Sequence, residues 1–280
     1  MRQNFELRYA CHPDDFKSYD TNRLRKDFAI QNLMVDDQIN MVYTMYDRYI
    51  GGGAVPRTEN LTLQTEDALK AEYFLERREL GIINVGGEGE VSVDGKIYTL
   101  GFKDALYIGR GNREIIFRSS SSSSPAHFYF NSAPAHKECA TKLIRMSDAE
   151  IAVMGSLESS NSRTIYKLIV NSVVETCQLQ MGLTELNSGS VWNTMPAHTH
   201  QRRSEVYMYF NLSKDDFVVH LMGKADETRH VIIRDGEAVL STSWSLHSGC
   251  GTKNYSFIWG MGGENQDFDD MDWIPKKEMK

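Results

Sequence analysis

The sequence predicts an all-β fold, because short strand-like runs alternate with turn residues along most of its 280 residues. Runs rich in β-branched and aromatic residues recur from residue 41 onward, and Gly, Asp or Asn separates most of them. Asp94-Gly95, between two such runs, is typical of a tight hairpin turn that needs positive φ. Regularly spaced short strands indicate a β-sandwich or a barrel. In the first half we expect strands at residues 41–46, 81–85, 90–93, 105–108 and 115–117.

A short helical arm is expected before the first of these strands. Residues 20–28 place charged and apolar side chains at helical spacing, and Asp20 or Thr21 is suited to cap the helix. Polar residues 156–163 indicate a domain junction near this point, and strand-like runs resume at residues 168–170 and 178–181. We therefore predict two β domains, one at residues 1–150, preceded by the arm, and one at residues 151–280.

Charge and composition exclude several kinds of partner. The formal net charge is −7 and the pI is about 5.7, so we expect no nucleic-acid partner, which would need a concentrated basic face. No apolar run approaches the roughly 20 residues that a membrane helix needs, and we expect no membrane partner. The four cysteines lie far apart without Cys-x-x-Cys spacing, and no secretory signal precedes them, which is typical of reduced thiols in a cytoplasmic protein.

The strongest functional signal is a candidate metal site in the second half. His198 and His200 are two residues apart, so an extended strand would direct both side chains to one face. Glu205 lies at the start of a strand-like run, and His247 arrives far downstream, from a strand expected on the opposite wall of a barrel. Three imidazoles and one carboxylate suit first-row divalent ions, and zinc is our first choice. The alternative is a set of unrelated surface or core histidines.

This ligand pattern resembles the metal-binding motifs of the cupin superfamily, and longer strings resemble its 5-keto-4-deoxyuronate isomerases. The resemblance implies a bicupin, with two jelly-roll β-barrels, one Zn²⁺ per subunit and commonly a hexamer. It also implies a ketol isomerase of pectin and uronate breakdown that converts the sugar acid 5-dehydro-4-deoxy-D-glucuronate to 3-deoxy-D-glycero-2,5-hexodiulosonate. The strings are FLERRELG at 74–81, DALYIG at 104–109, WNTMP at 192–196, FIWGM at 257–261, GENQ at 263–266 and FDDMD at 268–272.

The two halves also resemble each other, which predicts a duplicated barrel. Counting ten residues from the matching positions 104 and 237 reaches Glu114 in the first half and His247 in the second. Residues such as Tyr73 and Leu75 stand where the second half has its His-x-His pair. We therefore expect a front barrel without metal ligands. A further matching pair of segments is 76–79 with 201–205, with one residue fewer in the first.

A ketol isomerase needs a group that polarises a carbonyl and a base that moves a proton between adjacent carbons. A metal ion supplies the first as a Lewis acid. Glu205 is a candidate base if it leaves the metal, although an ordinary carboxylate is a weak base unless its pKa is raised. Proton transfer through an enediol and a hydride shift both remain open. The other candidate bases are Glu264, Asp269, Asp270, Tyr207 and Tyr209.

A carboxylate substrate calls for arginine, because a planar guanidinium binds a carboxylate through two hydrogen bonds. Arg202 and Arg203 lie between the ligands in the sequence, and Arg163 and Arg229 are further candidates. The acidic segment 267–272 is expected, on composition alone, to be a solvated edge. Two other functions remain open at this point. One is a metal-dependent cupin dioxygenase, and the other is a non-catalytic sugar-binding cupin.

Overall fold

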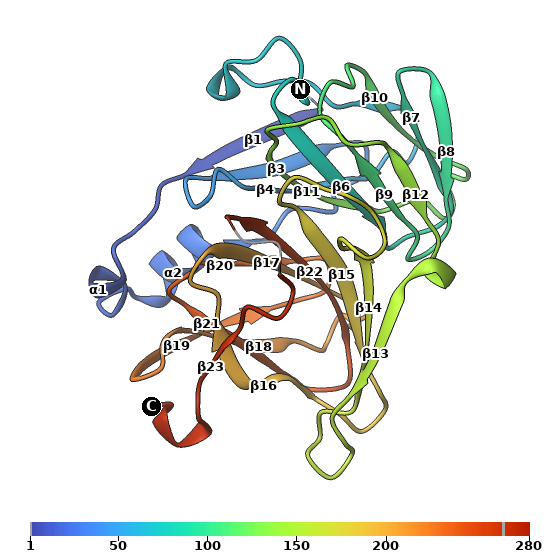
Figure 1. The fold of residues 1–280 in the computed structure, drawn as a ribbon. Coiled ribbons are helices and arrows are strands. Elements are labelled where there is room, and N and C mark those ends of the chain that lie inside the picture. Colours follow the sequence, from blue (N-terminus) through green and yellow to red (C-terminus); the bar gives the residue numbers. More distant parts are fainter. Residues whose placement is uncertain (1, 265–266) are drawn as a thin grey trace. The chain divides into compact units, whose positions relative to one another are not determined.

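The structure is a computed structural model that describes residues 2–264 and 267–280. Its regular secondary structure is mostly β-strand with a few short helices, and the all-β prediction is confirmed (Figure 1). The chain forms two compact units. Unit 1 comprises the described residues up to Arg8, residues 32–150 and residues 168–181. Unit 2 comprises residues 9–31, residues 151–167 and the described residues from Gly182 onward.

The two units interleave along the chain. The predicted junction near residue 150 lies at one of the boundaries between them, whereas residues 9–31 and 168–181 each belong to the unit that is built mainly from the other half of the sequence. The division into folding domains at residues 1–150 and 151–280 stays a prediction.

Unit 1 contains two sheets. Each strand predicted in the first half of the sequence overlaps one of their strands. The larger sheet has the order β1 (Gln3–Arg8), β3 (Ile39–Thr44), β4 (Ile50–Ala54), β11 (Phe128–Pro134), β6 (Arg78–Asn84), β9 (Ala105–Ile108) and β12 (Lys142–Ile144). The smaller sheet has the order β5 (Leu61–Thr62), β10 (Ile115–Ser119), β7 (Gly89–Val93) and β8 (Lys96–Leu100). Short 3₁₀ turns lie at Asp67–Leu69 and Met146–Asp148.

Unit 2 is also built on two sheets, and the boundary between the units falls within two strands, β14 and β15. The larger sheet has the order β13 (Glu150–Met154), β14 (Arg163–Ile169), β15 (Gln180–Leu186), β22 (Ser256–Gly263), β17 (Arg203–Phe210), β20 (Ala238–Ser241) and β2 (Ala29–Ile30). The smaller sheet has the order β19 (Glu227–Ile233), β18 (Val218–Lys224), β21 (Leu246–Gly251), β16 (Trp192–Thr199) and β23 (Asp272–Trp273). A 3₁₀ turn follows at Lys276–Glu278.

The predicted helical arm is present and belongs to unit 2. Helix α1 spans Pro13–Phe16, and helix α2 spans Thr21–Phe28. Asp20 caps α2 as predicted, since its side chain accepts a hydrogen bond from the N–H of Arg23 at 2.8 Å. Phe16 is buried and packs edge-on against Phe28 and Trp244, which attaches the arm to the barrel of unit 2. No helix of the described residues is long and apolar enough to cross a membrane.

The central strands of the two units match one to one in chain order. In the larger sheets, the run β3, β4, β11, β6, β9 corresponds to β14, β15, β22, β17, β20. In the smaller sheets, the run β5, β10, β7, β8 corresponds to β16, β21, β18, β19. Nine consecutive strands are therefore repeated in the same order, which supports the internal duplication inferred from the sequence.

Strand register extends this match to single residues. Leu80 of β6 pairs with the last residue of β9, as Glu205 of β17 pairs with the last residue of β20. Phe117 of β10 lies opposite the third-last residue of β7, as His247 of β21 lies opposite the third-last residue of β18. Leu61 pairs with Phe117, as His198 pairs with His247. Leu63, two residues after Leu61, then takes the place of His200.

These equivalences correct the predicted counterparts of the ligands. Leu61 and Leu63, and not Tyr73 and Leu75, stand where unit 2 has its His-x-His pair, and Phe117 stands where Glu114 was expected. The reason is the length of the connections. Leu80 lies 19 positions after Leu61, whereas Glu205 lies only 7 positions after the corresponding His198. The link between β9 and β10 is also longer than the link between β20 and β21.

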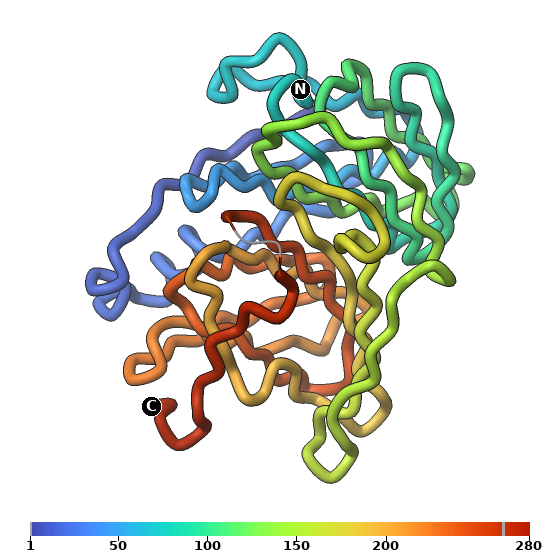
Figure 2. Tube along the Cα trace, viewed as in Figure 1, coloured from blue at the N-terminus to red at the C-terminus, as the bar shows by residue number. Residues whose placement is uncertain are grey.

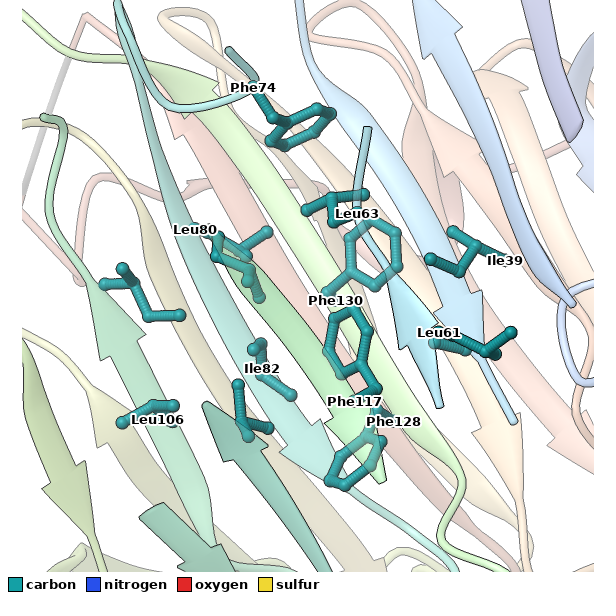
Figure 3. Packing of buried hydrophobic residues seen from close by; sticks show 14 of the residues in the cluster. Ile39, Leu61, Leu63, Phe74, Leu80, Ile82, Leu106, Phe117, Phe128 and Phe130 are labelled. Atoms are coloured by element: carbon teal, nitrogen blue, oxygen red, sulfur yellow. The ribbon is translucent and has the colours of Figure 1, made fainter. Parts of the chain in front are cut away.

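The interior of unit 1 is apolar at all four equivalent positions. Leu61, Leu63, Leu80 and Phe117 belong to one buried hydrophobic cluster, and they lie together with Phe128 and Phe130 in Figure 3. None of these side chains offers a lone pair that binds a cation. The same strand arrangement therefore holds an apolar core in unit 1 and polar ligands in unit 2.

Glu79, next to Leu80 on β6, is fully buried in unit 1. Its carboxylate accepts hydrogen bonds at 2.8 Å from the backbone N–H groups of Cys177, Gln178 and Leu179, and one at 2.6 Å from the hydroxyl of Tyr107. Burial, with the neighbouring Glu79 carboxylate, raises the pKa of Tyr107, so its hydroxyl remains a donor. Within unit 1, Glu79 thus binds residues 177–179 to strand β6.

We expect Glu79→Ala to lower the free energy of unfolding by about 3 kcal/mol, because it leaves three buried N–H groups and one hydroxyl without their acceptor. Urea unfolding followed by tryptophan fluorescence measures the change. Glu114→Ala, at an exposed position of the same unit, is the control and should stay within about 0.5 kcal/mol of the parent. Equal losses in both variants would contradict a role for the Glu79 hydrogen bonds.

Candidate metal centre

Both sheets of unit 2 contribute to a cluster of four buried side chains. His198 lies on β16, His200 follows the end of that strand, and His247 lies on the neighbouring β21. Glu205 comes from β17 in the larger sheet. The sequence brings His198 and His200 to one side because one residue separates them in nearly extended chain at the end of β16. The four residues predicted as metal ligands therefore converge, as one group of possible ligands, with their donor atoms within 4.8 Å of one another.

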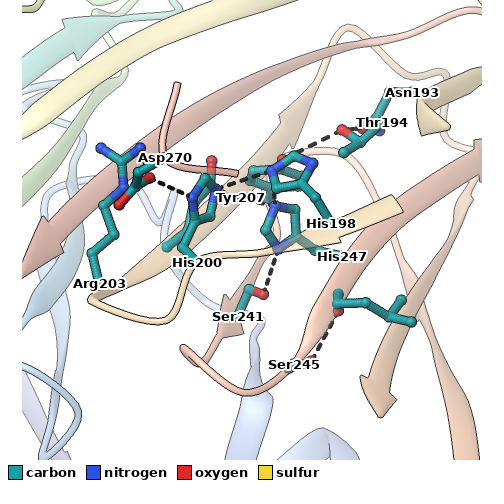
Figure 4. A network of polar contacts seen from close by, with 12 residues as sticks. Asn193, Thr194, His198, His200, Arg203, Tyr207, Ser241, Ser245, His247 and Asp270 are labelled. Atoms are coloured by element: carbon teal, nitrogen blue, oxygen red, sulfur yellow. Dashed lines mark hydrogen bonds and ion pairs between the residues drawn. The ribbon is translucent and has the colours of Figure 1, made fainter. Parts of the chain in front are cut away.

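The donor atoms face one another at short distances. The Nε2 atom of His198 lies 3.0 Å from the Nε2 atoms of both His200 and His247. Oε2 of Glu205 lies 3.0 Å from Nε2 of His247 and 3.4 Å from Nε2 of His200. Figure 4 shows the three histidines facing one another. All four side chains are at most 5% exposed. Three ring nitrogens and one carboxylate oxygen thus surround a common point in the interior.

Hydrogen bonds on the outer side of the rings fix the orientation of two imidazoles. Nδ1 of His247 lies 3.0 Å from Oγ of Ser241, and Nδ1 of His200 lies 3.0 Å from Oδ1 of Asp270. An imidazole that donates from Nδ1 carries its lone pair on Nε2, which is the atom directed to the centre. Asp270 is held in turn by an ion pair of 2.5 Å with the buried Arg203. These outer contacts are the support that metal-binding histidines require.

The protonation states also suit a cation. Burial lowers the pKa of His198 well below its usual value, and the neighbouring His247 and His200 lower it further, so the ring is neutral. Burial alone would raise the pKa of Glu205, but His247 and His200 outweigh it and bring the pKa below its usual range. Among the described residues, Oε2 of Glu205 has no hydrogen-bond partner. A neutral His198 beside an ionised carboxylate that has an unsatisfied oxygen fits a divalent metal ion.

A cavity of about 210 Å³ adjoins this centre, and His198, His200 and Glu205 form part of its wall. The rest of the wall is mostly apolar, with a few polar groups, which is typical of a small-molecule site. The remaining lining residues are Ala152, Met154, Arg163, Ile165, Lys167, Thr184, Thr194, Tyr207, Phe257, Trp259, Met261, Phe268, Asp269, Met271 and Trp273.

Two cations reach the cavity from one strand. Arg163, Ile165 and Lys167 alternate along β14, so their side chains lie on the same face of the sheet. Arg163 is half-buried and donates to the carbonyl oxygen of Asn161 at 2.9 Å, and burial lowers the pKa of its guanidinium. Nζ of Lys167 lies 4.4 Å from the ring centre of Phe268. This wall can attract an anionic group of a ligand.

The C-terminal segment closes one side of the cavity. Trp273 of β23 pairs with His198 of β16. The C-terminal segment that contains β23 is the red end of the chain in Figure 2. Phe268, Asp269 and Met271 line the cavity, and Asp270 bonds His200. The expectation of a solvated acidic edge for residues 267–272 is confirmed for Asp267, Asp269 and Asp272, which are exposed, whereas Asp270 is half-buried because it contacts His200 and Arg203. Residues 265 and 266 of the string GENQ lie outside the described residues.

The four predicted substrate-binding arginines occupy different environments. Arg163 is part of the cavity wall. Arg202 is exposed and pairs with Glu264, Arg203 is buried against Asp270, and Arg229 pairs with Glu227 of β19. Position in the sequence between two ligands does not decide which way a side chain points. The substrate-binding role of Arg202, Arg203 and Arg229 stays a prediction that their positions do not favour.

The candidate bases predicted from the sequence also occupy different environments. Of the candidate bases, Glu205, Tyr207 and Asp269 line the cavity. Burial, with the nearby Glu205 carboxylate, raises the pKa of Tyr207 well above its usual value, so its phenol is neutral. The sequence analysis missed Lys167 and Thr194. Alternation along a strand from Arg163 would have indicated Lys167, whereas nothing local indicated Thr194.

Thr194 has an unusual backbone conformation. Its φ is +50°, in the left-handed region that β-branched residues rarely adopt, at a cost of about 1–3 kcal/mol. It lies in a bulge of β16, where the pairing with β21 shifts between Asn193 and His198. A bulge re-aims side chains beside a functional site, and this one directs Thr194 to the cavity.

Comparisons with known proteins agree with this geometry. Residues 29–276 match the model of the KduI/IolB family. Proteins named 4-deoxy-L-threo-5-hexosulose-uronate ketol-isomerase, from Formosa agariphila and, as number 1, from Bacteroides thetaiotaomicron, are 56% and 54% identical over the full length of both chains. Among solved structures, an IolB-like protein of Salmonella typhimurium LT2 matches with a TM-score of 0.66 and 14% identity, over 81% of this chain and 87% of that one. The Lactobacillus farciminis oxalate decarboxylase matches with a TM-score of 0.55 and 11% identity, over 81% and 78%. These structures show a shared fold.

We expect Ser241→Ala to raise the dissociation constant for Zn²⁺ about tenfold, because it removes the partner that orients His247. Competition with a fluorescent zinc chelator measures this constant. The control is Thr242→Val, next in the chain, whose buried hydroxyl has no hydrogen-bond partner among the described residues and whose loss should leave zinc affinity unchanged. Zinc affinity that stays at the parent value in Ser241→Ala would show that the hydroxyl does not support the ligand.

Proposed function

The chain belongs to the KduI/IolB family, and from this premise we propose that it is a metal-dependent ketol isomerase. Its substrate is 5-dehydro-4-deoxy-D-glucuronate, which is 4-deoxy-L-threo-5-hexosulose uronate, and its product is 3-deoxy-D-glycero-2,5-hexodiulosonate. The full-length relatives carry the name of this activity. It places the protein in the breakdown of pectin and other uronates. The observation that carries the proposal is a His₃Glu centre on the wall of a cavity that also presents Arg163 and Lys167.

The reaction moves a carbonyl group by one carbon. The C–H bond of the hydroxyl-bearing carbon breaks, a C–H bond forms at the former aldehyde carbon, and one proton passes between the two oxygens, so no oxidant is consumed. The bound cation supplies Lewis acidity toward the carbonyl oxygen. Arg163 and Lys167 bind the carboxylate at the far end of the substrate. The apolar lining excludes water from the reacting carbons.

The base is assigned among the carboxylates of the cavity wall. Glu205 was the first candidate, but its lowered pKa makes it a weak base while it faces His247 and His200. Asp269 lines the same cavity and is not among the four metal ligands. We therefore assign proton transfer between the two carbons to the carboxylate of Asp269, with Glu205 as a ligand.

The metal and the assembly are further parts of the proposal. We assign one Zn²⁺ per subunit, because three imidazoles and a carboxylate are a donor set that zinc favours. The hexameric assembly follows the family resemblance, and the cytoplasmic location follows the four separated cysteines, which are typical of reduced thiols. The same donor set with iron would suit a cupin dioxygenase, and a cavity without turnover would suit a sugar-binding protein, so the decisive test concerns the metal and the oxygen requirement.

Removal of the metal with a chelator is expected to abolish isomerase turnover, and Zn²⁺ is expected to restore it without oxygen. The measurement is formation of the ketose product in an anaerobic chamber, with circular dichroism as a check that the metal-free protein keeps its fold. Turnover that required iron and consumed oxygen would support the dioxygenase instead. A chelated, metal-free protein that retained full activity would remove the metal from the proposal.

Arg163→Gln is expected to raise the KM for the uronate about tenfold to a hundredfold, because it removes a charge-assisted contact with the carboxylate. Steady-state kinetics measure the change. Arg202→Gln is the matched control, since Arg202 is exposed and absent from the cavity wall, and its KM should stay within about twofold. A larger effect at Arg202 than at Arg163 would transfer the carboxylate site to the loop after His200.

A further inference from the structure

Two hydroxyl groups stand side by side on the cavity wall next to the metal centre. Oγ1 of Thr194 lies 3.4 Å from the phenol oxygen of Tyr207, and both residues line the cavity. The ring of Tyr207 packs edge-on against the ligand His247, with the ring centres 5.1 Å apart. The pair therefore lies beside the place where the reacting end of a substrate would bind (Figure 4).

A chain of buried hydrogen bonds fixes the direction of the Thr194 hydroxyl. Tyr255 donates its phenol hydrogen to the carbonyl oxygen of Gly249 at 3.0 Å, so its oxygen can only accept the bond of 2.8 Å from Nδ2 of Asn193. The amide oxygen of Asn193 then faces Thr194 and accepts its hydroxyl hydrogen at 2.5 Å. Because this hydrogen is committed to Asn193, the Thr194 oxygen presents lone pairs toward Tyr207 and the cavity.

Tyr207 complements this acceptor with a donor. Because the Thr194 hydrogen is used by Asn193, the 3.4 Å contact can only be one in which Tyr207 donates, and it is long for a bond between two hydroxyls. A ligand oxygen at an ordinary hydrogen-bond distance would therefore take the phenol hydrogen in place of Thr194. An acceptor and a donor placed side by side match one hydroxyl group, which donates its hydrogen to Thr194 and accepts a hydrogen from Tyr207.

The backbone shows that this arrangement is specified. Thr194 is held at φ +50° within the bulge of β16, and Asn193 is fully buried. A Cβ atom on Gly249 would lie 2.9 Å from Nδ2 of Asn193 and 3.0 Å from the hydroxyl of Tyr255, so only glycine leaves room for the hydrogen-bond chain. The fold thus accommodates an unfavourable residue conformation and a close approach, and both serve to aim one hydroxyl.

We propose that Thr194 and Tyr207 form the binding site for the substrate hydroxyl on the carbon next to the aldehyde, with Thr194 as acceptor and Tyr207 as donor. This proposal rests on the isomerase function proposed above, and it adds the two residues that bind one hydroxyl of the substrate. The site sets the orientation of the carbon that loses its hydrogen, because it holds the oxygen attached to that carbon. It also discriminates against sugar acids that lack a hydroxyl there, since their binding would leave Thr194 and Tyr207 with only their long mutual contact in place of two normal hydrogen bonds.

The test uses two variants of Thr194 that differ in one group. Thr194→Val keeps the branched shape at the strained position and removes the hydroxyl, whereas Thr194→Ser keeps the hydroxyl. We expect kcat/KM for the uronate to fall about tenfold or more in Thr194→Val and to stay within about threefold in Thr194→Ser. Tyr207→Phe should cause a loss similar to that of Thr194→Val. Thr199→Val, on the same strand and absent from the cavity wall, is the control and should keep the parent value.

Calorimetric binding of D-gluconate gives a readout that is independent of turnover. This open-chain sugar acid has a hydroxyl on every carbon except the carboxylate and has no carbonyl to isomerise. Its dissociation constant in the metal-free protein should rise about tenfold in Thr194→Val and recover in Thr194→Ser. In the double variant with Tyr207→Phe, the loss should be smaller than the product of the two single losses, because both groups bind the same oxygen.

The outcomes separate this inference from the proposed function. If the parent isomerises the uronate but Thr194→Val keeps both its kcat/KM and its gluconate affinity, the hydroxyl site is wrong and the isomerase stands. If the parent binds gluconate with the expected pattern among variants but turns over no uronate, the isomerase is wrong and the hydroxyl site stands. Equal losses in Thr194→Val and Thr194→Ser, or a loss of zinc stoichiometry in Thr194→Val alone, would assign Thr194 a structural role and overturn the proposal.

Discussion

Three ring nitrogens and one carboxylate oxygen converge inside unit 2, and many contacts in the surrounding structure depend on this convergence. Ring nitrogens 3.0 Å apart in a buried site are unfavourable when their lone pairs face each other, and a proton or a cation between them removes this cost. The outer ring nitrogens need partners as well, which Ser241 and Asp270 provide, and Asp270 in turn explains why Arg203 is buried. Each buried polar group near the centre thus needs a partner of its own, and for His200 that partner is Asp270 of the C-terminal segment.

The two units show how one strand arrangement accommodates opposite interiors. Leu61, Leu63, Leu80 and Phe117 occupy in unit 1 the places of the four ligands in unit 2, and they are packed against other apolar side chains. One polar group that unit 1 buries on β6, Glu79, lies next to Leu80 and accepts hydrogen bonds from backbone N–H groups. Side chains alternate along a strand, so Glu79 points to the opposite face from Leu80, the counterpart of the proposed ligand Glu205.

Local patterns predicted the features that depend on local geometry. The spacing of His198 and His200, the cap at Asp20 and the short strands all follow from the period of the backbone, and each is present. Features that depend on register between distant strands were missed or misplaced. The first-half counterparts of the ligands were wrong because connections of unequal length shift a simple count. The roles of Ser241 and Thr194 depend on partners in other strands, which a single sequence does not reveal.

The cavity combines few polar groups with much apolar surface, so each polar group has a large influence on how a ligand is held. The cationic side chains Arg163 and Lys167 come from β14 in the larger sheet. Thr194 and the histidines of the centre come from β16, the residue after it, and β21 in the smaller sheet. On the function proposed above, a sugar acid would be oriented by chemistry at both ends, with its carboxylate toward β14 and its carbonyl toward the proposed metal. The bulge that strains Thr194 lies between Asn193 and His198. The same short stretch of β16 therefore positions one proposed metal ligand and the hydroxyl that is proposed to recognise the substrate.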